Sequence, residues 1–376
     1  MKKLIFQPFF LIFVSVILFC HLTPKSLAVS FDLSGQISAR YDLKHSNSNW
    51  QNALGLRYLS EVQVKLFSDD SPFDAEMMLN NFIFSGENAE TDSDVKIYRL
   101  KLRYAATQAE FRLGLQKINF GPAQLLRSLM WFDRVNPTDP LRMTHGVWGA
   151  RFRYFFLNNT NIWAWCLYGN DEPKGMETFP SNEEIPEWGG RLQFPVPHGE
   201  IGLTYHTRAV KPETVNSNNF REDRYALDGR WDLGIGLWFE STVQQQHEVY
   251  LPYQWRHMIT VGADFTFGLG NGLYAVAEYN GTFLSDEMLT VEDEYRFIAC
   301  SFSYPVSIFD SFSIFSFYHL REESLYVYLN WQRTYDRWVI NPGIYWYPET
   351  ATYSQFASSG NAGGGFGAQL MIIFNH

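Results

Sequence analysis

The sequence has little cysteine and, after its first 28 residues, no long hydrophobic run. Beyond that stretch only Cys166 and Cys300 remain. Strand alternation puts Cys166 on the face opposite its tryptophan neighbours and Cys300 alongside Phe302, so a disulfide between the two is not expected. No later segment has the 18 or more consecutive apolar residues that a transmembrane helix needs. A protein held together by disulfides and a helical membrane protein are therefore both disfavoured.

Motifs for enzyme or metal chemistry are also missing. The nine histidines are scattered, and there is no H-E-x-x-H, C-x-x-C or G-x-S-x-G sequence. Residues 363–368 fit G-x-G-x-x-A, but an alternating strand pattern follows where a nucleotide-binding fold needs a helix. We therefore expect no metal, no cofactor and no catalytic residues, and we do not expect an enzyme.

The first 28 residues have the pattern of a secretory signal peptide. Lys2 and Lys3 form the basic start, residues 9–20 the apolar core, and Ser26-Leu27-Ala28 a small-residue cleavage site. Cleavage after Ala28 would leave residues 29–376 as the folded protein. Without the signal, 27 basic residues face 40 acidic ones, a net charge of −13 that disfavours a nucleic-acid partner.

Most of the remaining chain alternates apolar and polar residues with a period of two, the pattern of strands with two unlike faces. In 94–106 the two faces are Tyr98, Leu100, Leu102 and Tyr104 against Arg99, Lys101 and Arg103. If Thr107–Gln108 is a two-residue turn, the next strand pairs so that Arg103 lies opposite Arg112. Such a like-charge pair requires acidic partners or an anionic ligand.

Eighteen segments follow this pattern, and short turns alternate with long polar connections between them. Aromatic residues make up 17% of the sequence. Together these features predict an all-β fold, a transmembrane antiparallel β-barrel of about 18 strands, or 16 if the weak segment 187–194 is not a strand. A soluble β-sandwich or β-helix is the alternative. The expected strands are 31–43, 53–67, 73–84, 95–106, 109–118, 147–157, 160–169, 187–194, 200–208, 222–232, 235–246, 254–267, 272–281, 292–304, 308–318, 324–333, 337–346 and 363–374.

The polar residues that we expect to face inward form a basic group and an acidic group. The basic wall consists of Arg99, Lys101, Arg103, Arg112, Arg151 and Arg153, and the acidic positions on later strands are Asp228, Asp232, Glu240, Asp264 and Glu278. One interpretation is a transverse field that selects charged solutes. The other is mutual neutralisation inside a plugged barrel. Inward aromatic residues could form a stacking track for sugars or anchor the strand ends at the membrane interface: Trp238, Tyr274, Tyr326 and Tyr328.

The third long connection, residues 119–146, carries an apolar cluster that solvent would not favour: Leu125, Leu126, Leu129, Met130, Trp131 and Phe132. Because eighteen strands enclose a wide lumen, we expect this loop to fold inward and narrow it, with a short helix over Leu125–Trp131. Acidic loop residues would meet the basic wall and basic ones extend it: Asp133, Asp139, Arg127, Arg134 and Arg142. An outer cap on neighbouring loops is the alternative.

The run GLQKINFGPAQ followed by NPTDPLRMTHGV resembles a strand and loop of Gram-negative porin-like and alginate-export-like barrels. The resemblance covers about forty residues. It implies a monomeric 18-stranded barrel with basic residues in the pore, and it assigns pore-lining roles to Arg112 and Gln116.

The sequence thus predicts an outer-membrane channel of a Gram-negative bacterium that passes small hydrophilic, anionic or zwitterionic solutes through a charged constriction. A barrel enzyme acting on lipid and a plugged structural or adhesive barrel are the alternatives. The expected partners are outer-membrane lipid, the solutes and the barrel-assembly machinery, because the last strand ends near an aromatic residue, Phe374.

Overall fold

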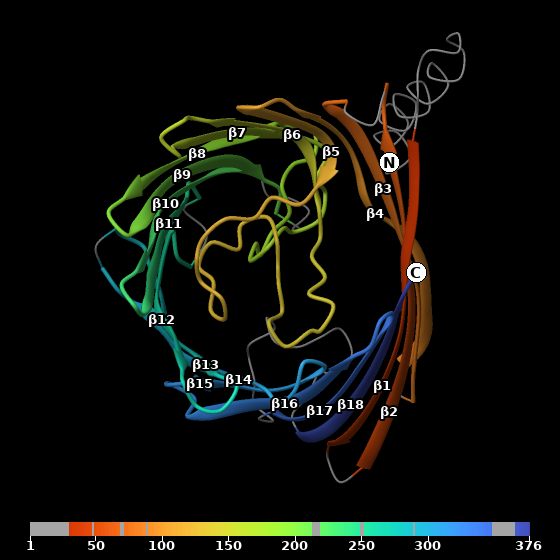
Figure 1. Ribbon diagram of the computed structural model, residues 1–376. Coiled ribbons are helices and arrows are strands. Elements are labelled where there is room, and N and C mark those ends of the chain that lie inside the picture. Colours follow the sequence, from red (N-terminus) through yellow and green to blue (C-terminus); the bar gives the residue numbers. More distant parts are fainter. Residues whose placement is uncertain are drawn as a thin grey trace.

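All eighteen strands of the computed structural model join in one closed antiparallel sheet, which Figure 1 shows as a ring around two inward loops. The structure describes residues 30–46, 49–67, 71–87, 89–212, 219–248, 252–288, 290–347 and 365–376. Each strand pairs with the next one in sequence, and β1 pairs with β18 to close the barrel. The expected signal peptide lies outside the described residues.

The strands have the following bounds: β1 Ser30–Ser46, β2 Asn49–Lys65, β3 Phe73–Gly86, β4 Ala89–Ala105, β5 Ala109–Gln116, β6 Val147–Phe155, β7 Asn161–Leu167, β8 Glu187–Val196, β9 Gly199–Val210, β10 Phe220–Asp232, β11 Gly236–Gln246, β12 Trp255–Phe267, β13 Leu273–Ser285, β14 Asp293–Pro305, β15 Asp310–His319, β16 Ser324–Thr334, β17 Trp338–Tyr347 and β18 Gly365–Asn375.

The predicted barrel of eighteen strands is confirmed, and the segment that made sixteen conceivable is β8. The largest error in strand bounds is at β4, which begins at Ala89 instead of residue 95. Its first six residues have no apolar face, yet they continue the backbone pairing with β3. A hydrophobic pattern cannot detect a strand of this kind.

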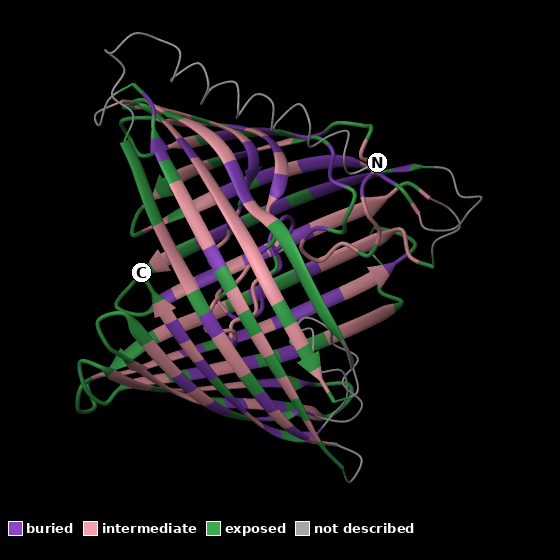
Figure 2. Cartoon of the chain, turned by 90° about the vertical axis from the view of Figure 1, so that its right-hand side faces the viewer, coloured by how far each residue is buried: buried purple, intermediate pink, exposed green. Residues whose placement is uncertain are grey.

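Apolar side chains cover the outer face of the barrel. Along the strands, exposed residues alternate with buried ones (Figure 2), and the exposed positions include Leu203, Tyr225, Leu227 and Ile344. A surface this apolar on a closed barrel requires a hydrocarbon environment. Cys166 and Cys300 are free thiols. Among the described residues, no helix is long and apolar enough to cross a membrane.

Residues 117–146 leave the wall after β5 and cross the lumen before they return to β6 (Figure 1). The predicted inward fold of this loop, here called the constriction loop, is confirmed, because all six residues of its apolar cluster are buried. The predicted helix over Leu125–Trp131 is wrong, and turns and extended backbone occupy that segment. Its amides donate to carboxylates of the opposite wall and not to carbonyls of a helical turn.

Candidate functional site

Two glutamates on the far wall hold the constriction loop by its backbone. The carboxylate of Glu278 on β13 accepts hydrogen bonds from the amides of Gln124, Leu125 and Leu126 at 2.7, 2.9 and 2.5 Å. Glu240 on β11 accepts from the amides of Ala123 and Leu129, both at 2.9 Å. Hydrogen bonds to charged acceptors are among the stronger ones in proteins, so the loop has a defined seat.

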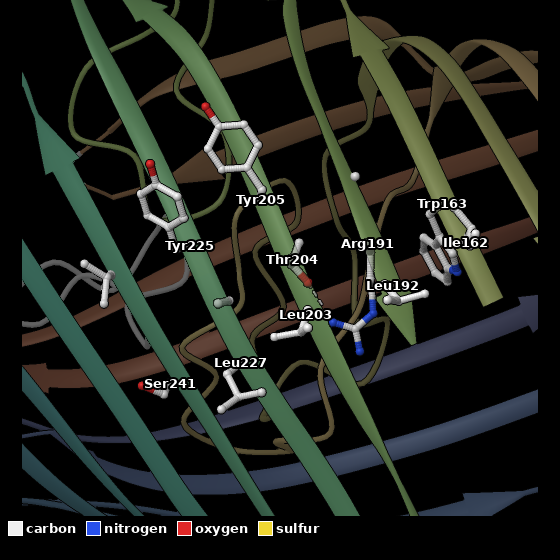
Figure 3. Close-up of a pocket in the computed structure, with 13 residues that line it drawn as sticks. Ile162, Trp163, Arg191, Leu192, Leu203, Thr204, Tyr205, Tyr225, Leu227 and Ser241 are labelled. Carbon is white, nitrogen blue, oxygen red and sulfur yellow. Dashed lines mark hydrogen bonds between the residues drawn. The ribbon is translucent and has the colours of Figure 1, made fainter. Parts of the chain in front are cut away.

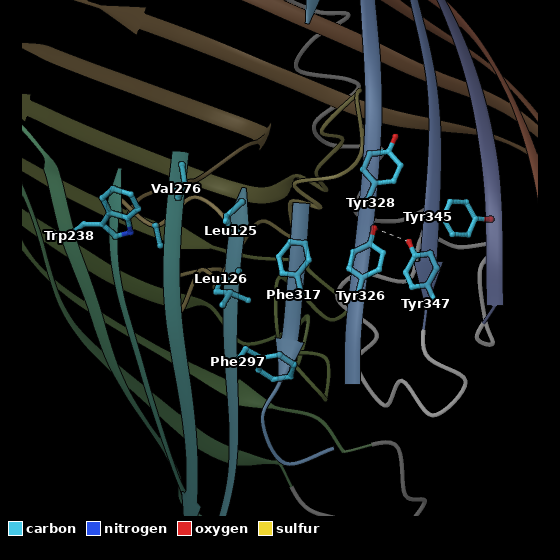
Figure 4. Close-up of a cluster of buried hydrophobic side chains, with 12 residues drawn as sticks. Leu125, Leu126, Trp238, Val276, Phe297, Phe317, Tyr326, Tyr328, Tyr345 and Tyr347 are labelled. Atoms are coloured by element: carbon cyan, nitrogen blue, oxygen red, sulfur yellow. Dashed lines mark hydrogen bonds between the residues drawn. The ribbon is translucent and has the colours of Figure 1, made fainter. Parts of the chain in front are cut away.

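The apolar side of the loop packs on inward aromatic residues, as Figure 4 shows for one cluster. Leu125 and Leu126 join Trp238, Phe317 and Tyr326 in this cluster. A second cluster brings loop residues together with the tryptophans of β7: Phe120, Trp131 and Phe132 with Trp163 and Trp165. The predicted inward position of the aromatic residues is confirmed, but Trp238, Tyr326 and Tyr328 are buried beneath the loop and form neither an exposed stacking track nor an interface belt.

The basic wall on β4, β5 and β6 has the predicted register. Arg103 lies opposite Arg112, and Arg112 lies opposite Arg151. Glu110 resolves the like-charge contact, because its carboxylate accepts from Arg112 and from Arg151 at 2.8 Å each. Two acids of β3 bind two further cations, with Asp74 at 2.7 Å from Arg103 and Glu76 at 2.7 Å from Lys101. Arg153 lies over the ring of Trp163 at 3.9 Å.

At Tyr98 the structure departs from the predicted alternation. A register shift in the β3–β4 ladder leaves Tyr98 as an extra residue between Ile97 and Arg99. Such a bulge redirects a side chain, and the hydroxyl of Tyr98 accepts a hydrogen bond from the amide of Thr144 at 3.1 Å. Arg99 then donates to the carbonyl of Thr144 at 3.0 Å, which ties the end of the constriction loop to β4.

Gln116 lies within the wall, where it is fully buried and donates to the carbonyl of Gly149 at 3.0 Å. Its amide therefore joins β5 to β6 and does not face open lumen.

The charged residues of the constriction loop differ in their burial. Asp133 is 1% exposed and binds Arg127 at 3.2 Å and Asn119 at 2.6 Å, so it meets its own loop and not the basic wall. Arg134 and Arg142 are exposed. Asp139 accepts from the amide of Leu141 at 3.1 Å.

Sequence reasoning missed two arginines near Asp139. Arg40 on β1 binds Asp42 at 2.6 Å, and Arg40 and Arg57 on β2 both lie within electrostatic range of the Asp139 carboxylate. Both alternate with exposed apolar neighbours such as Tyr41 and Tyr58, so the same period-two pattern could have identified them. The candidate site therefore consists of the cations on β1, β2 and β4–β6 together with an acid on the loop that crosses the lumen.

Most of the acidic residues predicted to face inward on the later strands have binding partners. Asp228 binds Arg191 at 2.5 Å, and Asp264 lies 3.3 Å from Arg230. Since Glu240 and Glu278 bind loop amides, little of the acidic wall is left to face a solute. Asp232 is exposed at the strand end.

A second loop, residues 168–186, also lies inside the ring, and the sequence did not predict it. Its Lys174 contacts Glu187 at 2.9 Å and Glu177 at 3.3 Å, and all three side chains are at most 5% exposed. Arg208 and Arg224 bind Glu222 at 2.6 Å each, and both also contact Glu177. Three cations and three carboxylates thus form one balanced buried network.

This second loop also touches the constriction loop. The amide of Met176 donates to the carbonyl of Met130 at 3.0 Å. The adjacent Gly175 has φ +49°, and a Cβ there would lie 1.9 Å from the same carbonyl oxygen. Only glycine permits so close an approach.

No protein-family model matches the sequence, and no curated protein matches it. Solved structures do match: OpdQ of Pseudomonas aeruginosa is 9% identical, covering 92% of this chain and 99% of that one with a TM-score of 0.58. OccK5 (OpdH) of the same species is 11% identical, covering 92% and 98% with a TM-score of 0.57. The outer membrane channel DcaP of Acinetobacter baumannii is 11% identical, covering 93% and 98% with a TM-score of 0.50.

The fold is that of outer-membrane porins. At such low identity the likeness is one of fold alone, and the residues of this porin-like barrel have to be interpreted by their own chemistry. Among the described residues there is no group of histidine, cysteine and acidic side chains that could hold a metal ion.

Proposed function

We propose that this protein is an outer-membrane channel that passes small hydrophilic solutes, anionic or zwitterionic, through the passage between the constriction loop and the basic wall. The observation that carries the proposal is the loop seated across the lumen, which leaves a strongly charged wall facing it. The porin-like fold and the apolar outer face support a location in the outer membrane of a Gram-negative bacterium. Cleavage after Ala28 and assembly by the barrel-assembly machinery belong to the same proposal.

The wall has a surplus of positive charge. Its six predicted cations have three acidic partners, Asp74, Glu76 and Glu110, and Arg99 binds uncharged groups of Thr144 and Tyr98. The net charge of this set is +3. Inside a narrow lumen salt screens fixed charges less than at an open surface, so the surplus favours anions there despite the acidic net charge of the chain.

Partly exposed carboxylates among the cations extend the range of solutes to zwitterions. Asp74 is 23% and Glu76 16% exposed at the side chain, so an ammonium group could contact them while a carboxylate contacts an arginine. The paired state of these acids also fits a plugged barrel, and a lipid-active enzyme is the other alternative. Conductance separates the channel from both.

Replacing Arg103 and Arg112 together with glutamine should move the reversal potential under a salt gradient toward cation preference. The change removes two positive charges from the wall but leaves Glu110 bound to Arg151. Planar-bilayer recordings of the refolded protein measure the effect.

A control with the same loss of charge is the double variant Arg296→Gln and Arg333→Gln. These arginines lie on outward-facing rows, where each contacts an acid. The control should leave the reversal potential unchanged. A parental reversal potential in the Arg103/Arg112 variant would mean that these arginines are structural partners only.

A further inference from the structure

A groove of about 760 Å³ lies on the outer face of the barrel, across β7 to β11. Figure 3 shows its apolar lining, in which residues of four neighbouring strands take part: the exposed Ile162, Leu192, Leu203, Tyr225 and Leu227 and the partly buried Tyr205. Small outward residues leave room for it, since Gly190 lies opposite Tyr205 and Ser241 lies opposite Leu227.

One end of the groove carries a polar cluster that shares Tyr205 with the apolar lining. The hydroxyl of Tyr205 donates to Asp223 at 2.8 Å, and its ring lies 5.2 Å from that of Tyr225. Arg221 donates to Asp223 at 2.9 Å and to the Tyr205 hydroxyl at 3.2 Å. His247 lies 2.9 Å from Asp223. An apolar groove is thus continuous with a charged end.

The side chains of Arg221 and His247 are 61% and 41% exposed, whereas that of Asp223 is 4% exposed. The accessible groups at this end are therefore the cation and the imidazole, and the carboxylate lies beneath them. A guanidinium has five N–H donors, more than the three bonds that Arg221 makes here. Arginine binds phosphate well because its planar donors match the oxygens.

The position of the cluster fits a lipid headgroup. It lies where β9 ends and β10 begins, at the end of the barrel with the longer connections, while the apolar lining continues toward the middle of the strands. Tyrosines at such a boundary present their rings to hydrocarbon and their hydroxyls to the polar layer.

A second outer groove of about 770 Å³ across β1 to β4 is lined by Asp94, Arg57 and His376 beside apolar residues such as Ile83 and Val95. The side chain of its acid, Asp94, is 50% exposed, unlike that of Asp223. It therefore fits an anionic headgroup less well than the first.

We propose that the groove across β7 to β11 holds an acyl chain of a phosphorylated lipid whose phosphate is bound by Arg221 and His247. This inference rests on the membrane-spanning barrel and does not depend on what the channel transports. The protein then binds this lipid selectively, in contrast to the non-specific contact that the rest of its outer face makes with the bilayer.

Native mass spectrometry of the detergent-purified protein tests the proposal, with phosphatidylglycerol as the anionic probe and phosphatidylcholine as the zwitterionic one. The parent should retain one phosphatidylglycerol in preference to phosphatidylcholine. Arg221→Gln should lower that preference roughly tenfold, the effect of losing a charge-assisted hydrogen bond. Ser241→Phe should fill the groove and abolish retention of both.

Matched controls lie elsewhere on the outer face. Ala277→Phe adds the same bulk at an exposed outward position of β13, and Arg296→Gln removes an outward arginine paired with an acid on β14. Both variants should retain the two lipids as the parent does. Equal retention by Ser241→Phe and Ala277→Phe would overturn the proposal. An oligomer that Ser241→Phe dissociates would also overturn it, in favour of a second copy of the chain as the occupant.

If Ser241→Phe does not fold, as judged by its heat-dependent migration on a gel, the Arg221→Gln comparison decides. An unchanged preference between the two lipids would then contradict the headgroup assignment.

Discussion

Replacing Glu278 with alanine should release the constriction loop from the far wall and raise the single-channel conductance. The carboxylate accepts hydrogen bonds from three consecutive loop amides and from the indole of Trp238. Hydrogen bonds to a charged group each contribute about 1.5–3 kcal/mol. Losing all four bonds should weaken the seat of the loop by several kcal/mol, so that the loop leaves it more often.

Three further variants calibrate this result. Glu278→Gln keeps one acceptor oxygen and should give an intermediate conductance, while Glu294→Ala, a partly buried acid on β14, should have no effect. Deleting Ser128–Arg142 removes half of the loop and should also raise the conductance. If the deletion leaves conductance unchanged in a folded barrel, the loop does not limit the passage. If the deletion raises the conductance but Glu278→Ala does not, Glu240 alone is sufficient to anchor the loop.

Replacing Lys174 with methionine should lower the free energy of unfolding by about 3–5 kcal/mol, the cost of leaving a buried ion without its partner. The ammonium group contacts Glu177, Glu187 and the hydroxyl of Ser181 at 3.3, 2.9 and 2.7 Å. Without it, three carboxylates of the buried network share only two guanidinium groups. Urea titration followed by tryptophan fluorescence in micelles measures the loss.

Lys211→Met is the control, because Lys211 is exposed beside the same wall. Surface substitutions of this kind change stability by about 0.5 kcal/mol or less. A similar small value for Lys174→Met would show that water reaches the network. Limited proteolysis should in addition cut residues 168–186 faster in the Lys174 variant, since this loop loses its attachment.

The strands could be predicted because lipid imposes one requirement on every one of them. Outward residues must be apolar, so the period of two is visible in residues such as Leu203 and Leu227 even without homologues. The pairing of Arg103 with Arg112 followed from the two-residue turn between their strands. The bulge at Tyr98 could not be foreseen, because one inserted residue leaves no mark in the pattern of hydrophobicity.

The two inward loops differ in how far the sequence predicts them. The constriction loop was predictable, since Leu129 and Phe132 are too apolar for solvent. Its anchors, Glu240 and Glu278, were predicted to face inward but not to bind the loop, because nothing in the local sequence connects Leu125 with Glu278. Residues 168–186 are polar, and polar residues are buried when they find partners of opposite charge. Such pairing involves β8, β9 and β10 at once and is invisible in the loop sequence alone.

The seat of the constriction loop also implies an order of events during assembly. Its bonds join residues that are 111 to 154 positions apart, and the receiving carboxylates belong to strands that follow the loop in the chain. Contacts between such distant residues form late, since the intervening chain must be ordered first. The nascent barrel therefore passes through a stage in which its lumen is wide, and the narrow passage is a late acquisition. Pulse proteolysis during refolding should find residues 117–146 cleavable after the barrel has become resistant.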